Sequence, residues 1–166
     1  MAERNHNNTY LPRDEATRLE DGAATVTVSR NGQVGGSDRI LDLGDDAFDA
    51  VEGHAAFLRG EIVFDLSTFD FTTGDEFVEA VVQLSLKADF ADSIIERERI
   101  RFGVAKDGAD IDLPAATDGS VRIVMPVDNE VNEIRYRYMR LRFISGGTTP
   151  IATIDAFFTK QLQLAG

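Results

Sequence analysis

The chain has no cysteine and no tryptophan, and its 166 residues include only two histidines and four prolines. Without cysteine it can form neither disulfides nor cysteine-based metal sites. Its histidines, His6 and His54, offer little material for a Ser–His–acid triad, and no G-x-S-x-G motif or phosphate-binding loop accompanies them. The sequence therefore predicts a protein that is not an enzyme and that uses no cofactor.

Long apolar runs are also missing. No segment approaches the roughly 18–20 apolar residues that a membrane span needs, and the polar N-terminus lacks the apolar centre of a signal peptide. We therefore expect synthesis in the cytoplasm and no membrane partner. Residues 1–22 have almost no apolar periodicity, which predicts an extended arm that either frays or orders against a neighbouring subunit. Residues 23–166 are predicted to form one domain.

Positive charge is scarce in the first part of the chain. Residues 1–92 hold 7 of the 17 basic residues but 19 of the 29 acidic ones, so they carry the whole net charge of −12. Binding to phosphate backbones depends on clustered lysine and arginine, so this balance argues against a nucleic-acid partner. Two acidic clusters have the oxygen ligands that Ca²⁺ prefers, but neither fits EF-hand spacing, which favours aspartates used in turns and at a helix start. The clusters are Asp42, Asp45, Asp46, Asp49 and Glu52, and Asp107, Asp110 and Asp112.

What the chain does have is alternation. Residues 77–87 alternate apolar and polar side chains most clearly, as in a half-buried strand. Similar segments recur about every ten residues, Asn31-Gly32 suits a type I′ turn, and residues 45–56 could form one short helix. With seven to nine strands and no strand–helix alternation, we predict an all-β, antiparallel β-sandwich or jelly-roll-like domain. The expected strands lie within 23–28, 39–43, 58–66, 77–87, 94–104, 121–125 and 130–160.

Residues 130–160 predict a hairpin, because two alternating segments flank a Gly-Gly-Thr-Thr-Pro turn. The apolar phase changes at Tyr138-Met139. Either a β-bulge re-aims the strand there, or the core covers one face and a partner covers the other.

Arginines alternate along two of these segments and could form a basic patch if the segments share a sheet. One interpretation is pairing with glutamates inside the chain, and the other is docking onto an acidic surface of a neighbouring subunit or a capsid shell. The candidate interface residues are Arg97, Arg99, Arg101, Arg135, Arg137, Tyr138, Arg140 and Arg142.

Three segments give the chain a family resemblance: EAVVQLSLKADFADS at 79–93, SVRIVMPVDN at 120–129 and YRYMRLRFISGGTTPIATIDAFFT at 136–159. Through their strands and turns, residues 57–160 resemble the small β-sandwich cement (decoration) proteins of tailed-bacteriophage capsids. The acidic segment 38–52 and the arm have no counterpart in that resemblance.

The resemblance implies a non-enzymatic structural protein of the virion, located on the outer surface of the capsid. Its partner would be the major capsid protein of a phage, and it would act as a homo-oligomer, a trimer, that clamps neighbouring capsomers. A carbohydrate-binding β-sandwich module that adheres to host glycans is the alternative, since Tyr10, Tyr136 and Tyr138 could contact sugars. A glycoside-active enzyme is the least favoured reading, because nothing marks a particular carboxylate pair.

Overall fold

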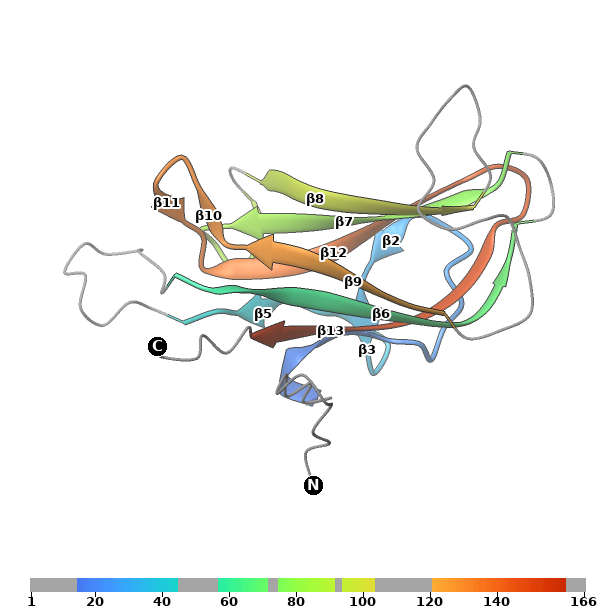
Figure 1. The fold of residues 1–166 in the computed structure, drawn as a ribbon, viewed down its shortest axis with the longest axis horizontal. Coiled ribbons are helices and arrows are strands. Elements are labelled where there is room, and N and C mark those ends of the chain that lie inside the picture. The colour runs from blue at the N-terminus through green and yellow to red at the C-terminus, as the bar shows by residue number, and fades with distance from the viewer. Residues whose placement is uncertain (1–14, 45–56, 72–74, 92–93, 104–120, 161–166) are drawn as a thin grey trace.

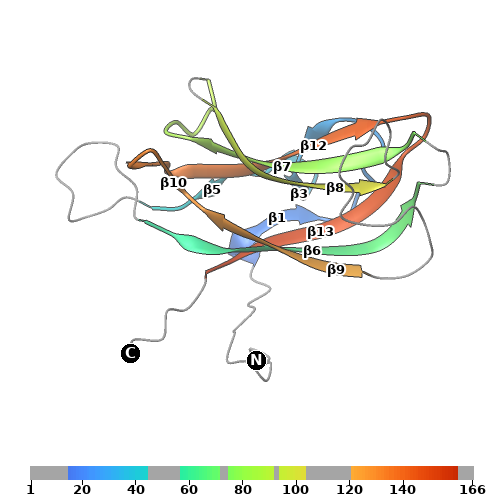
Figure 2. The same ribbon diagram turned by 45° about the horizontal axis from the view of Figure 1, so that its top comes forward.

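The computed structural model describes residues 15–44, 57–71, 75–91, 94–103 and 121–160. These residues form strands and one short 3-10 turn, η1 (Glu15–Thr17). The strands build two antiparallel sheets that pack face to face (Figures 1 and 2). The predicted all-β antiparallel sandwich is therefore confirmed.

The first sheet, here called the β6 sheet, has the strand order β1-β13-β6-β9. Its strands are β1 (Arg18–Asp21), β13 (Ile151–Lys160), β6 (Arg59–Asp70) and β9 (Val121–Asp128). Pro126 lies on β9, the edge strand, where a missing backbone N–H does the least damage. Because β1 pairs with β13, the sandwich begins before the predicted boundary at residue 23.

The second sheet, the β7 sheet, has β12 (Tyr138–Gly146), β7 (Phe77–Ser85) and β8 (Ile95–Gly103) side by side. Two short strands, β2 (Arg30–Asn31) and β5 (Leu41–Asp42), pair with the other side of β12. The remaining strands of the described residues form two small hairpins: β3 (Gln33–Val34) with β4 (Ser37–Asp38), and β10 (Glu130–Val131) with β11 (Ile134–Arg135).

Alternate residues of both sheets point inward and form one core. On β12 and β7 the inward residues lie opposite one another in register, for example Leu141 beside Val82. Phe64 on β6 meets Phe102 on β8 edge to face, with ring centroids 6.0 Å apart, and so joins the two sheets. Both rings are fully buried.

The predicted hairpin over residues 130–160 is wrong. β12 and β13 do not pair with each other, since β12 pairs with β7 and β13 pairs with β6. The connection crosses from one sheet to the other, and buried Glu76 holds it by accepting hydrogen bonds from the backbone N–H and hydroxyl of Thr149, both at 2.9 Å. Alternation identifies the core-facing side of each strand but not the strand beside it, so a crossover and a hairpin look alike in sequence.

The type I′ turn predicted at Asn31-Gly32 is also wrong, because Gly32 does not have a positive φ. Gly32 serves a close approach instead: a Cβ there would collide with the carbonyl oxygen of Leu19. The residue pairs with positive φ lie in the β3–β4 and β10–β11 turns, at Gly35-Gly36 (61° and 75°) and Asn132-Glu133 (50° and 66°).

The phase change at Tyr138-Met139 does not come from a bulge. β12 pairs with β7 in unbroken register from Tyr138 to Gly146. The change marks the point where the chain leaves the β10–β11 hairpin and enters the β7 sheet, with Met139 as the first inward residue. The predicted helix at 45–56, both histidines and most of the acidic clusters lie outside the described residues.

Candidate functional site

The outer face of the β7 sheet is covered by arginine side chains. The outward residues of its central strand β7 are Glu79, Val81, Gln83 and Ser85, and all four are buried even though they face away from the core. Beside them in register lie Arg99 and Arg101 on β8, and Arg140 and Arg142 on β12. Long guanidinium side chains can cover an apolar sheet face with their methylene stems, which is why β7 is buried on both faces.

Five of the predicted interface arginines pair with carboxylates of the same chain. The nitrogen–oxygen distances are 2.9 Å for Arg97–Asp128, 3.0 Å for Arg99–Glu96, 3.4 Å for Arg101–Glu79, 3.0 Å for Arg135–Glu130 and 2.8 Å for Arg137–Asp42. These contacts correspond to the first of the two interpretations, pairing inside the chain. The interface role of these arginines stays a prediction.

Arg140 and Arg142 are different, because their hydrogen-bond partners are neutral amides. Arg140 Nε donates to Gln83 Oε1 at 2.9 Å, and its guanidinium lies 4.2 Å from the centroid of the Phe90 ring. Arg142 Nη1 lies 3.4 Å from Asn31 Oδ1. Within the described residues, neither guanidinium has a carboxylate in ion-pair contact. Arg140 is thus held in place and Arg142 is held more weakly, and the charge of Asp38 acts on both without direct contact.

Burial changes the pKa of Arg140. Desolvation is the main cause of the lowered pKa of Arg140; the nearby charge of Asp38 acts to raise this pKa, and that of Arg142 acts to lower it. Phe90, which packs against it, is buried on the outside of the sheet rather than in the core. Tyr138, the remaining candidate, is half-buried at the start of β12, with Arg137 5.3 Å from its ring centroid.

Carboxylates at the margin of this face have lowered pKa values. The hydrogen bond from Arg137 is the main cause for Asp42, and the hydrogen bond from Asn31, at 2.6 Å, is the main cause for Asp38. In both cases the hydrogen bonds outweigh the opposing effect of burial.

We expect the protein to lose stability in acid. Asp21, Asp38 and Asp42 have folded-state pKa values below their ordinary ones, so their ionised forms stabilise the fold above about pH 4 and this contribution is lost as the pH falls further. Urea unfolding between pH 6 and pH 2.5 measures the change, which should flatten in Asp38→Asn. An unfolding free energy that stays constant over this range would contradict the prediction.

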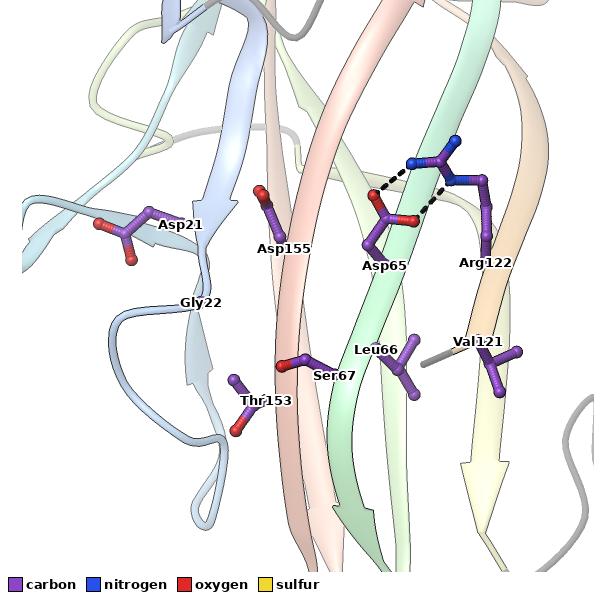
Figure 3. Close-up of a pocket in the computed structure, with 9 residues that line it drawn as sticks. All are labelled: Asp21, Gly22, Asp65, Leu66, Ser67, Val121, Arg122, Thr153 and Asp155. Atoms are coloured by element: carbon purple, nitrogen blue, oxygen red, sulfur yellow. Dashed lines mark hydrogen bonds and ion pairs between the residues drawn. The ribbon is translucent and has the colours of Figure 1, made fainter. Parts of the chain in front are cut away.

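The opposite outer face, on the β6 sheet, carries an open groove of about 600 Å³ (Figure 3). One cross-strand register line forms its floor: Asp21 on β1 lies opposite Asp155 on β13, which lies opposite Asp65 on β6, which lies opposite Arg122 on β9. The other lining residues are Gly22, Leu66, Ser67, Val121 and Thr153.

Guanidinium groups compensate the like charges that this register places side by side. Arg122 donates two hydrogen bonds, of 2.6 and 2.8 Å, to the carboxylate of Asp65, and Arg18 donates two, both of 3.2 Å, to that of Asp155. Asp21 points away from the other groove side chains in Figure 3. The Asp21 carboxylate accepts hydrogen bonds from the backbone N–H groups of Ala23 and Gly35. Burial acts to raise the pKa of Asp21, but these hydrogen bonds outweigh burial, so the pKa is lowered.

Two local irregularities open the groove. Thr153 pairs with Thr68 while Ile154 pairs with Leu66, so Ser67 is the extra residue of a β-bulge. On the other side, β1 ends at Asp21 and the chain rejoins β13 only at the Val26–Ala152 bridge. The edge of β13 between these points is left without a strand partner.

Sequence reasoning missed the whole groove, because its polar residues come from four strands and share no spacing. It also missed Gln83 and Phe90, which position Arg140.

Among the residues that the structure describes, none forms an apolar helix of the length that a bilayer requires. In the same part of the chain, no group of three or more His, Asp or Glu side chains is arranged to bind a metal ion. A scan against protein-family models, a search of curated proteins and a search of solved structures each find no match to this chain.

Proposed function

We propose that the chain is a non-enzymatic structural protein of a phage virion, which binds the outer surface of the capsid through the outer face of its β7 sheet and stabilises contacts between capsomers. The observation that carries the proposal is the pair Arg140 and Arg142, whose hydrogen-bond partners are neutral amides and which have no carboxylate in direct contact among the described residues. The resemblance to capsid cement proteins supplies the identity of the partner, the major capsid protein, and the trimeric state.

The positions of these two cations suit docking. The guanidinium of Arg140 is already ordered by the Phe90 ring and the Gln83 amide, so it loses little side-chain entropy when a partner's carboxylate arrives. Arginine forks pair with carboxylates through two parallel hydrogen bonds and are enriched at protein interfaces. The net charge of −12 disfavours non-specific association between copies, so an acidic partner surface would be attracted mainly to the outer face of the β7 sheet.

We expect Arg140→Gln/Arg142→Gln to bind mature capsids at least tenfold more weakly than the wild type, because two bidentate contacts are lost. Co-sedimentation of the purified protein with expanded capsids and with procapsids of the encoding phage measures the effect. The wild type should bind expanded capsids and raise their resistance to heat.

The single variant Arg142→Gln should also weaken capsid binding, and Arg59→Gln provides its matched control. It removes one positive charge from an exposed arginine of the β6 sheet, and it should leave capsid binding unchanged. If the wild type binds neither particle, the proposed function is wrong. If the double variant binds as the wild type does, the docking face is wrong.

A further inference from the structure

We propose that the groove on the outer face of the β6 sheet is a binding site for a neutral, hydroxyl-rich carbohydrate. This inference does not rest on capsid binding, because it concerns the opposite face of the sandwich (Figures 2 and 3). The residues that would contact the sugar are Asp65, Ser67, Arg122, Thr153 and Asp155.

The chemistry of the lining matches that of a sugar. Each sugar hydroxyl both donates and accepts a hydrogen bond, and the groove offers both functions at close range. Asp65 and Asp155 each have lone pairs beyond those that bind guanidinium nitrogens, and such fixed carboxylates accept well from hydroxyls. The hydroxyls of Ser67 and Thr153 can donate or accept; the Thr153 hydroxyl lies 3.3 Å from that of Thr25, and Figure 3 shows Ser67 and Thr153 close to β13.

The groove is also preorganised for a ligand. The two bidentate pairs, Arg122–Asp65 and Arg18–Asp155, hold the carboxylates in fixed orientations on neighbouring central strands. The bulge places Ser67 at the surface where a regular strand would continue the ladder. The side chains of Leu66 and Val121 face the core, so the groove offers hydrogen-bonding groups rather than an apolar surface. A volume of about 600 Å³ lies within the usual range of small-molecule sites.

Other ligand classes fit less well. Three aspartates stand against the guanidinium groups of Arg122 and Arg18, and this excess of negative charge disfavours phosphate, sulfate and other anions. The aspartates do not form a metal-binding group, and two of them already pair with arginines. An apolar ligand would desolvate the charged and hydroxyl side chains of the lining without replacing their hydrogen bonds to water. A neutral polyhydroxyl compound can exchange hydrogen bonds with these carboxylates and hydroxyls without bringing a second negative charge to them.

The test is a glycan array of neutral, sialylated and sulfated glycans, followed by calorimetric titration with the neutral glycan that binds best. We expect retention of neutral glycans and none of the anionic ones. Thr153→Val removes one hydroxyl at constant shape and should weaken binding about three- to tenfold. Asp155→Asn removes a charge-assisted acceptor and should weaken it about tenfold or more.

Thr68→Val is the matched control, because Thr68 is the cross-strand partner of Thr153 but does not line the groove. It should bind as the wild type does, and thermal unfolding should show that all three variants are folded. If the array retains no neutral glycan, or if Thr153→Val and Asp155→Asn both bind like the wild type, the proposal is wrong. Capsid binding would be unaffected by either result, so failure of this proposal is distinguishable from failure of the proposed function.

Discussion

Replacing Asn129 by alanine should lower the free energy of unfolding by about 2–5 kcal/mol, a large effect for one side chain. Asn129 is fully buried, and its amide joins three parts of the chain. Its Oδ1 accepts from the backbone N–H of Leu58 at 2.8 Å, and its Nδ2 donates to the carbonyl oxygen of Tyr136 at 2.9 Å. Alanine would leave both backbone groups without these partners, and an unsatisfied buried group costs about 1–3 kcal/mol.

Location increases the importance of these bonds. Asn129 follows the end of β9 in the β6 sheet, while Tyr136 lies just before β12 in the β7 sheet. The backbone of Asn129 bonds the same two residues, donating to Leu58 at 3.2 Å and accepting from Tyr136 at 2.8 Å. The side chain therefore ties the two sheets together at the end where the β10–β11 hairpin begins.

Urea unfolding of Asn129→Ala and Asn129→Asp measures the effect. The aspartate keeps the acceptor for Leu58 but loses the donor to Tyr136, and it places an ionised carboxylate in a site without solvent. Relative to the wild type at the same pH, Asn129→Asp should be more destabilised at pH 7 than at pH 4, where protonation restores a donor. If Asn129→Ala lowers the free energy of unfolding by less than about 1 kcal/mol, the Asn129 side chain does not hold the two sheets together as proposed.

The second large effect is expected for Glu20→Ala, which should destabilise the fold by roughly 3–5 kcal/mol. Glu20 is fully buried on β1, and its two carboxylate oxygens accept from Arg30 Nη1 and Nη2 at 2.7 and 2.8 Å. It also accepts from the backbone N–H of Gln33 at 2.7 Å. Removing the carboxylate leaves a largely buried guanidinium without its charge partner.

The hydrogen bond to Glu20 is the main cause of the raised pKa of Arg30. This ion pair links β1 of the β6 sheet to β2 of the β7 sheet, so its loss should loosen the sandwich at one edge. Thermal and urea unfolding of Glu20→Ala, Arg30→Met and Glu20→Ala/Arg30→Met form a double-mutant cycle. The double variant should lose less stability than the sum of the two single variants, since it leaves neither charge alone. Additive losses would contradict the coupling.

Much of the architecture follows from local pattern. The alternation of residues 77–87 predicted β7, and the segments 58–66, 94–104 and 121–125 correspond to β6, β8 and β9. Alternation works here because each strand has one face on the core. It failed to predict that the outer face of β7 is buried too, since covering by arginines from β8 and β12 depends on which strands are neighbours.

Pairing between distant segments could not be predicted. The segments that became β12 and β13 looked like a hairpin because they are close in sequence, yet they lie in different sheets. The same limit hid the groove, where one register line brings together Asp21, Asp155 and Asp65. Asn129 gave no signal either, because a single buried amide has no periodicity. The arginine rows were visible in sequence, but their individual partners were not.

The position of β13 has a consequence for the order in which the molecule can assemble. β13 lies between β1 and β6 in the middle of the β6 sheet, and its pairing of Phe157 with Arg18 joins segments far apart in the chain. During synthesis on the ribosome β1 and β6 are made well before the strand that separates them, so that sheet can close only late. The β7 sheet has the same order of events on a smaller scale, since β7 and β8 can pair before β12 is made. Such long-range pairing is slow. The half-formed sandwich therefore exposes the inner faces of β1 and β6 until the final strand inserts between them.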